Sequence, residues 1–378
     1  MVYITVMQSP SYRQMTLDEL LSPSFHASPM ISANITNTKT YEVEQVSQRF
    51  LKHIDITELI SKLIAFNTAA ESLRGRPRHE LFRTFHIPKR SGGLRKIDAP
   101  EPELMTALRN LKTIFEVDFR ALYHTSAFAY VKGRSTLDAV KRHQKNESKW
   151  FGKYDLSNFF GNTTLDFVMK QFSMVFPFSE VMKYATGRTE MEKALELAFL
   201  NGGLPQGTPI SPLITNIIMI PIDFKLSNKL RNFDGHHFTY TRYADDFLIS
   251  SRVGFDQASV GKFLSDTLAE FGAPFSFNHS KTRYGSSAGR NWNLGVMLNK
   301  DNEITVGHKK KRQFQSMLHN YLMNKRNGIE WDKHDVQVLD GYRSYYHMIE
   351  PAAIASIIEH ISTKMGMNAI QLIKEDLR

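Results

Sequence analysis

The chain lacks cysteine altogether, which excludes disulfide bridges and thiolate-bound metals. It also lacks a long uninterrupted apolar run. The most apolar stretch, Ile210 to Phe224, carries two prolines and an aspartate, so it is too short and too polar to span a membrane and is expected to be a buried helix. The N-terminus has no basic start followed by an apolar segment, so no signal peptide is predicted. These absences favour a protein of the reducing cytoplasm.

The chain has fewer acidic than basic residues, with 38 Asp and Glu against 48 Lys and Arg and a formal net charge of +10. Such a balance favours a polyanionic partner such as nucleic acid. Because many basic proteins bind no nucleic acid, the placement of the charge is more informative. The basic residues form short clusters at Lys89-Arg90, Arg95-Lys96, Lys132 to Arg134, Lys141-Arg142 and Lys309 to Arg312.

The 378 residues are enough for two or three subdomains. We expect an N-terminal helical extension over residues 1–80, a central domain over 81–300 and a helical module over 301–378. Residues 1–40 are polar and weakly periodic, which predicts a loosely packed lead-in. Apolar residues at helical spacing predict helices within 41–70 and 103–123.

The central segment alternates strand and helix patterns. Phe82 to Pro100 is expected to form a hairpin around Ser91-Gly92-Gly93. Trp150 to Leu156 is strand-like, and Phe238 to Ser250 predicts two strands around a turn. Helical spacing covers 165–178, 191–199 and everything after about 305. This order predicts an α+β fold in which helices back an antiparallel sheet.

Three aspartates stand where strands end. Asp245 and Asp246 occupy the turn between the two β-rich halves, and a turn rich in Asp is the ordinary explanation for such a pair. Asp155 closes an apolar strand, where a charge is costly unless it is paired or binds a cation. Between them, the segment LPQGTPISP (204–212) leads into an apolar helix. Proline is normal in a first helical turn, but Gln206 is not explained by helix initiation.

In this order, Asp155, LPQGTPISP and Tyr243-Ala244-Asp245-Asp246 resemble the A, B and C blocks of reverse transcriptases. The resemblance extends outward to the fingers block, the block before the catalytic strand, the D block and the primer grip, in PKRSGGLRKIDAP (88–100), AYVKGRST (129–136), SKTRY around Lys281 and NLGVMLN (293–299). The chain thus resembles the bacterial superfamily that includes retron and group II intron enzymes. The resemblance implies a right-hand polymerase, with fingers and palm over 81–300 and a helical thumb over 301–378.

The resemblance also implies an RNA-directed DNA polymerase that uses two divalent cations, Mg²⁺ or in its place Mn²⁺. Asp155 and Asp245 would bridge the metals and Asp246 would support the primer-side site. The backbone carbonyl of Leu156 could add a ligand. Lys281 matches the position that protonates pyrophosphate, although a lysine in a loop is more often a phosphate contact or a solvated side chain.

A nucleotide site is implied around these carboxylates. Lys89 and Arg95 would face the triphosphate from the hairpin; the ordinary alternative is two solvated surface cations. Phe160 falls where this family places a ring beneath the sugar that disfavours a 2′-hydroxyl, although it could equally be core. Gln206, Tyr243 and Ala244 complete the set of nucleotide-binding candidates.

Primer and template contacts are expected from two further segments. The primer grip would consist of Leu294, Gly295 and Val296, although a glycine that merely relieves crowding is as plausible there. Cations at the start of a helix oppose its dipole, which makes sense if phosphates occupy that end. The thumb helix begins with four such cations, Lys309, Lys310, Lys311 and Arg312.

Only a thumb's length of chain follows Asn299, so no RNase H, maturase or endonuclease domain is expected. We therefore favour a stand-alone bacterial enzyme of antiphage defence that copies a dedicated non-coding RNA into cDNA. Two stretches, 138–143 and 293–295, depart from the usual retron patterns. The alternatives are a template-independent or protein-primed DNA polymerase of the abortive-infection type, a retron enzyme making RNA-linked DNA and a non-catalytic RNA-binding scaffold. The intact aspartates oppose the last of these.

Overall fold

The computed structural model describes residues 3–8, 11–16, 55–89, 92–118, 123–287 and 296–378. At the N-terminus, strands β1 (Tyr3–Gln8) and β2 (Ser11–Thr16) pair as an antiparallel hairpin. Helices α3 (Ile56–Ala69) and α4 (Glu71–Arg74) follow. The expectation of a helical segment over 1–80 is therefore wrong for residues 3–16, where β-branched Ile4, Thr5 and Val6 favour a strand.

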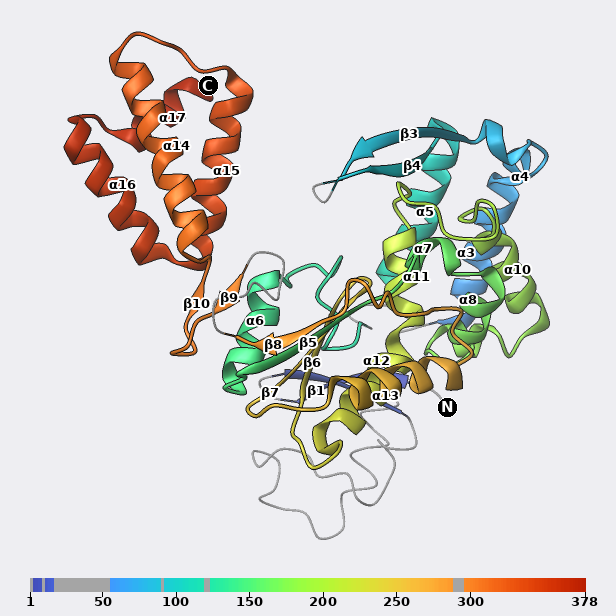
Figure 1. Cartoon of the computed structure of the whole chain (residues 1–378). Helices are drawn as coiled ribbons and strands as arrows, with labels where there is room; N and C mark the ends of the chain where they lie inside the picture. The colour runs from blue at the N-terminus through green and yellow to red at the C-terminus, as the bar shows by residue number, and fades with distance from the viewer. Residues whose placement is uncertain (1–2, 9–10, 17–54, 90–91, 119–122, 288–295) are drawn as a thin grey trace, which may run out of the picture.

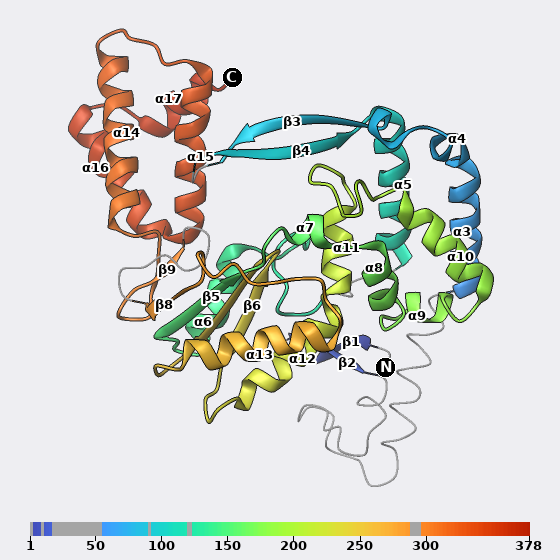
Figure 2. The same ribbon diagram turned by 45° about the vertical axis from the view of Figure 1, so that its right-hand side comes forward.

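The fingers consist of a long hairpin and one helix. Their elements are η2 (Arg78–Glu80), β3 (Phe82–Pro88), β4 (Leu94–Pro100) and α5 (Pro102–Asp118). The predicted hairpin is confirmed: it pairs from Phe82 opposite Pro100 to Pro88 opposite Leu94. Gly92 and Gly93 have φ of 87° and 79°, a conformation that glycine adopts without strain. The hairpin extends above the palm toward the thumb helices (Figures 1 and 2).

The palm is built on a four-stranded sheet in the order β6-β7-β5-β8, which is antiparallel as the sequence predicted. Its strands are β5 (Trp150–Asp155), β6 (Thr239–Tyr243), β7 (Asp246–Ser251) and β8 (Arg283–Ser286). Side chains alternate between the two faces of a strand, so the register decides which residues share a face. Asp155 lies opposite Asp246, and Lys153 lies opposite Leu248. One face of the sheet therefore carries both aspartates and the lysine.

Helices cover the other face of this sheet. Tyr154, Tyr240 and Phe247 point into a large apolar core together with residues of the palm and fingers helices. These helices are α7 (Phe159–Asn162), α8 (Leu165–Phe172), α9 (Phe178–Val181), α10 (Ala185–Glu196), α11 (Ser211–Ile218), α12 (Ile220–Lys229), η3 (Leu230–Asn232) and α13 (Gln257–Glu270).

Two helix predictions in the palm need correction. The helix expected over 165–178 ends at Phe172, and a separate short helix begins at Phe178. The buried helix expected over 210–224 is two helices that meet at Met219, each with a proline in its first turn. Proline is favourable at that position but cannot continue a preceding helix, so Pro221 separates the two.

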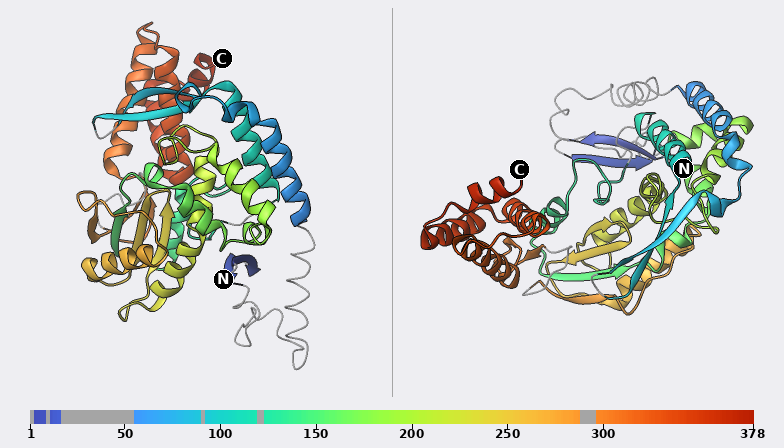
Figure 3. Two further views of the ribbon diagram at one scale, coloured as in Figure 1. Left: turned by 90° about the vertical axis from the view of Figure 1, so that its right-hand side faces the viewer. Right: turned by 90° about the horizontal axis from the view of Figure 1, so that it is seen from above.

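The thumb follows a short hairpin and is entirely helical, as predicted. The hairpin strands are β9 (Met297–Leu298) and β10 (Ile304–Thr305), and the helices are α14 (His308–Arg326), α15 (Lys333–Ile349), α16 (Pro351–Met365) and α17 (Ala369–Asp376). Phe314, Leu318 and Tyr321 are buried on one side of α14. Thumb and fingers lie at opposite ends of the palm (Figure 3).

A second apolar core joins the thumb to the catalytic face of the palm sheet. It contains Phe151 and Leu248 from the sheet, residues of the β9–β10 hairpin and the buried residues of the thumb helices. Val140 adds helix α6 (Thr136–Lys145) to the same core. Among the helices that the structure describes, none combines the length and the apolar character needed to cross a membrane.

Candidate active site

The three predicted metal ligands lie next to one another at the end of the palm sheet. Asp155 is the last residue of β5 and stands opposite Asp246, the first residue of β7. The carbonyl of Asp245 accepts a hydrogen bond of 3.0 Å from the amide of Leu156. Ala244 has a φ of 55°, which is unusual for a residue other than glycine and lets the chain turn within two residues. The fold thus brings the A and C blocks together, as the sequence predicted.

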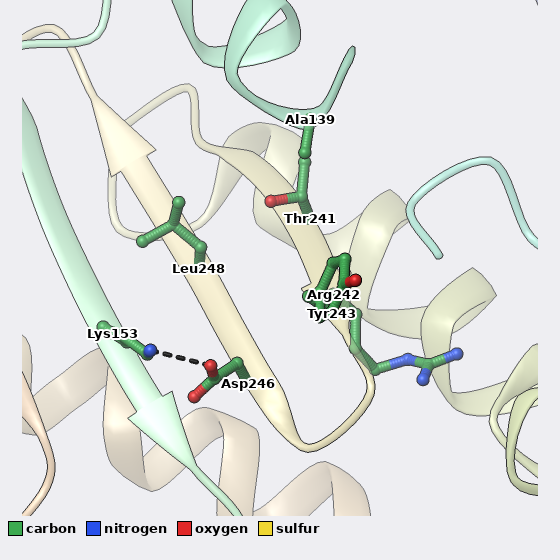
Figure 4. Close-up of a pocket in the computed structure, with 7 residues that line it drawn as sticks. All are labelled: Ala139, Lys153, Thr241, Arg242, Tyr243, Asp246 and Leu248. Atoms are coloured by element: carbon green, nitrogen blue, oxygen red, sulfur yellow. Dashed lines mark hydrogen bonds and ion pairs between the residues drawn. The ribbon is translucent and has the colours of Figure 1, made fainter. Parts of the chain in front are cut away.

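Two lysines neutralise two of these carboxylates. The Nζ atom of Lys281 lies 3.2 and 3.0 Å from the two carboxylate oxygens of Asp155. The Nζ atom of Lys153 donates to Oδ2 of Asp246 at 2.7 Å, as Figure 4 shows. Lys281 had been predicted as a site residue, whereas Lys153 had not. Its signal was its place two residues before Asp155, which puts both on one face of the strand.

Asp245 carries the excess of negative charge. Burial and the neighbouring charge of Asp246 raise its pKa to about 6. Burial also raises the pKa of Asp246, although Lys153 opposes that shift. Among the described residues, no three Asp, Glu, His or Cys side chains converge as a ready metal site, since Asp155 and Asp246 turn to their lysines. Clustered carboxylates with raised pKa values nevertheless fit hard divalent cations, which prefer oxygen ligands.

The raised pKa of Asp245 gives a testable stability difference in the absence of metal. Between its ordinary value of 3.8 and about 6, the folded protein binds more protons at this group than the unfolded chain does, so rising pH removes stability. Above pH 6, the free energy of unfolding of Asp245→Asn should therefore exceed that of wild type by roughly 1–3 kcal/mol, after allowing for partial exposure. The variant should accordingly unfold at a higher temperature.

Thermal unfolding in EDTA between pH 4 and pH 8 would measure this difference, which should vanish near pH 4. Asp234→Asn is the matched control. Asp234 is exposed and has a φ of 52°, which asparagine also tolerates. Equal stability of Asp245→Asn and wild type at pH 8 would contradict the charge excess.

The nucleotide-binding candidates of the fingers lie on one exposed face of the hairpin. Arg95 is directly opposite Ile87 in the register, and Ile97 lies on the same face two residues further along β4. That face turns toward the palm, because a Cβ added to Gly207 would lie 2.9 Å from Cγ2 of Ile97. Lys89 is exposed and bonds the hairpin turn through its amide, which donates to the carbonyl of Gly93 at 2.9 Å.

The segment 204–207 connects these fingers to the candidate sugar site. The carbonyl of Gln206 accepts a hydrogen bond of 2.8 Å from the amide of Asp98 in β4. The amide of Leu204 donates to the carbonyl of Phe160 at 2.9 Å. Phe160 is half-buried and its ring contacts that of Phe159, which is core. Gln206 and Phe160 are therefore held within a single backbone network.

The primer-grip and thumb candidates are only partly described. Leu294 and Gly295 lie outside the described residues, and Val296 is buried in the core between palm and thumb. Lys309 and Arg312 are exposed and Lys310 is half-buried. Lys311 instead pairs with Glu350 at 2.9 Å, and Oε2 of Glu350 accepts from Thr305 and Val306. Glu350, paired with Lys311, thus joins the thumb to the end of the β9–β10 hairpin.

A buried ion pair beneath the turn was missed by the sequence reasoning. The guanidinium of Arg242 and the carboxylate of Asp223 are fully buried and lie 2.8 Å apart. Arg242 also donates to the carbonyl of Ala244 at 3.1 Å and to Oδ1 of Asn216 at 3.2 Å, and the Tyr240 hydroxyl donates to Asp223. The signal was a charge in each of two apolar elements, which implies a partner.

Two arginines of the basic sequence clusters are used within the fold. Arg134 donates to the carbonyls of His124 and Ala127 at 2.6 and 2.7 Å. Arg142 donates to the carbonyl of Thr125 at 2.8 Å. These two side chains are therefore engaged within the protein, because the loop at 123–130 offers buried carbonyls that need donors.

The comparisons with known proteins agree with this geometry. Residues 87–319 match the model of the reverse transcriptase (RNA-dependent DNA polymerase) family. The chain belongs to the reverse transcriptase family. It is an RNA-directed DNA polymerase with the right-hand fold, and its relatives include bacterial retron enzymes. Reverse transcriptases generally use divalent metal ions.

Two relatives that the chain matches over most of their length are from Escherichia coli. The Retron Ec83 reverse transcriptase is 28% identical over 85% of this chain and 98% of its own length. The Retron Ec73 reverse transcriptase is 30% identical over 76% of this chain and 87% of its own length. Among solved structures, an apo telomerase from Candida tropicalis aligns with a TM-score of 0.42 and 13% identity, over 78% of this chain and 61% of that chain.

Proposed function

We propose that this reverse transcriptase makes cDNA by two-metal nucleotidyl transfer, with Mg²⁺ (or Mn²⁺ in its place) held by Asp155 and Asp245. The observation that carries the proposal is the register that sets Asp155 opposite Asp246, with the carbonyl of Asp245 accepting from the amide of Leu156, the residue after β5. Asp246 and the carbonyl of Leu156 complete the proposed ligand set. The two ions supply activation of the primer 3′-hydroxyl and stabilisation of the leaving pyrophosphate.

The two lysines then serve the substrate. Cations at the carboxylates would compete with the ammonium groups of Lys281 and Lys153 for Asp155 and Asp246. Lys281 is well exposed, with 61% of its side chain accessible, so it can turn to an incoming phosphate. Its proton is the one we assign to the leaving pyrophosphate. Lys89 and Arg95 bind the triphosphate from the other side, on the palm-facing surface of the hairpin.

Phe160 is proposed to select deoxynucleotides by occupying the space of a 2′-hydroxyl, next to Gln206, Tyr243 and Ala244. Phe160→Val should therefore raise the kcat/KM ratio of GTP to dGTP by about 10- to 100-fold, since the excluded group gains room. Single-nucleotide primer extension measures this ratio. The dGTP reaction of the same variant is the control, and an unchanged ratio would place Phe160 in the core only.

The template–primer duplex is proposed to lie between palm and thumb. The protein would hold it through its backbone and its A-like shape. Leu294, Gly295 and Val296 would contact the primer, and the exposed Lys309 and Arg312 would contact phosphates together with Lys310. Lys311 is the weakest of these candidates, because its ammonium group already forms an ion pair with Glu350.

The biological role we propose is antiphage defence in the bacterial cytoplasm, with a dedicated non-coding RNA as template. The relatives also favour the retron alternative, an enzyme that makes RNA-linked DNA. Both named E. coli relatives are retron enzymes, and Retron Ec83 is matched over 98% of its length. Against it stand residues 138–143 and 293–295, which differ from usual retron patterns.

Sequencing the nucleic acid that co-purifies with the protein would test this role. One abundant structured RNA, and DNA complementary to part of it, is the expected result. DNA that stays joined to RNA after protease and is freed by ribonuclease indicates the retron alternative. DNA released only by protease indicates protein priming. The absence of any bound RNA and of templated cDNA would contradict the proposal.

A further inference from the structure

Tyr130 is an exposed aromatic residue in a strained conformation. Its side chain is on the surface with 54% of the residue accessible, and its φ is 59°. A bulky residue in the left-handed region is uncommon, and such strain gathers at functional sites. The known features of the site give Tyr130 no role.

The backbone before Tyr130 runs beside the strand that leads to the catalytic turn. Ala127 forms a parallel bridge with Arg242. The amide of Phe128 donates to the carbonyl of Arg242 at 2.9 Å, and the amide of Arg242 donates to the carbonyl of Ser126 at 2.7 Å. Parallel segments advance together. Three residues beyond this bridge, one chain reaches Tyr130 and the other reaches the first aspartate of the turn.

The same two side chains fix both positions. Asn216 donates from Nδ2 to the carbonyl of Ala129 at 2.8 Å. Arg242 donates to Oδ1 of Asn216 at 3.2 Å and to the carbonyl of Ala244 at 3.1 Å. The residue before the tyrosine and the residue before the aspartate are therefore tied to one buried network, which sets the spacing between ring and carboxylate.

The surroundings of the phenol agree with this placement. Burial of part of the ring raises the pKa of Tyr130, and the nearby charge of Asp245 and the hydroxyl of Tyr243 raise it further, while Arg95 of the fingers lowers it. The phenol is thus neutral at physiological pH. It lies within electrostatic reach of the palm turn on one side and of the fingers on the other.

We propose that the ring of Tyr130 stacks on the template base that pairs with the incoming nucleotide. The inference rests on the proposed function, because it takes Asp155 and Asp245 as the metal ligands. Val296, the primer candidate that the structure describes, follows β8 in the chain, and β8 is one edge of the sheet order β6-β7-β5-β8. A duplex laid across that sheet therefore has its template strand at the β6 edge, where Tyr130 lies. Aromatic side chains recognise unpaired bases by stacking, whatever the sequence.

The test uses the full chain with an RNA template that carries 2-aminopurine at the templating position, annealed to a DNA primer. Stacking quenches 2-aminopurine, so binding of wild type in EDTA should quench it. Tyr130→Phe, which keeps the ring, should quench equally. Tyr130→Ala should lose the quenching and raise KM for the dNTP about 10-fold with kcat less affected. Tyr184→Ala is the matched control, since Tyr184 is 59% exposed and lies at the start of α10.

Equal quenching by Tyr130→Ala and wild type would overturn the proposal. So would a loss of quenching in Tyr130→Phe as large as in Tyr130→Ala, because the hydroxyl and not the ring would then make the contact. Thermal unfolding of each variant separates these outcomes from misfolding. Failure of the proposed function looks different: wild type would incorporate no dNTP, whatever the fluorescence reports.

Discussion

Asp155→Asn is expected to lower the rate of dNTP incorporation at least about 10⁴-fold, and Asp245→Asn should do the same. Each substitution keeps the size of the side chain but removes the charge that holds the metals, and a loss of this size corresponds to about 5–6 kcal/mol of transition-state stabilisation. The rate is measured by single-turnover primer extension on an RNA template with saturating Mg²⁺.

Two measurements make this result specific. Asp234→Asn, the exposed control, should retain the wild-type rate. The inactive variants should still bind primer–template, because their charge change leaves the basic fingers and thumb intact. A rate for Asp155→Asn or Asp245→Asn within a few-fold of wild type would show that the metal site lies elsewhere.

Arg242→Met is expected to destabilise the folded protein by about 3–5 kcal/mol, because it leaves the carboxylate of Asp223 buried without its partner. The midpoint of urea-induced unfolding measures the loss. Lys262→Met is the control: Lys262 pairs with Asp266 on the surface, at 2.6 Å, and the loss of such a pair costs under about 1 kcal/mol.

A double variant separates stability from positioning. Arg242→Met combined with Asp223→Leu replaces the ion pair by apolar groups and should recover most of the stability. It should still incorporate dNTP at least about 10-fold more slowly, because the carbonyl of Ala244 has lost its donor and the adjoining turn is less well held. Wild-type incorporation by the double variant would mean that Arg242 only stabilises the fold.

Both hairpins that carry the candidate site could be predicted from the sequence, because their signals are local. Gly92 and Gly93 favour a tight turn, and β-branched and aromatic residues flank the Ala244-Asp245-Asp246 turn. The relative order of the motifs then predicted the family. The break between α11 and α12 was also visible in Pro221, but the apolar run around it outweighed that signal.

Side-chain partnerships could not be predicted in the same way. That Lys153 shares a face with Asp155 follows from the two-residue period of a strand, but its contact with Asp246 depends on the register between β5 and β7, which distant segments set. Arg134 is a related case: a basic cluster can bind phosphates only when the fold leaves its donors free, and carbonyls of the fold accept them here.

The fingers hairpin can be treated as an arm whose hinge is the hydrogen bond from the amide of Asp98 to the carbonyl of Gln206. From Asp98 to Gly93 near the tip the chain takes five residue steps, so the arm measures about 17 Å at roughly 3.3 Å per residue. A rotation of about 10° at the hinge would carry that end through about 3 Å, close to one hydrogen-bond length. A small rotation at one backbone hydrogen bond therefore suffices to move Lys89 toward a phosphate or away from it, without any change in the strands themselves.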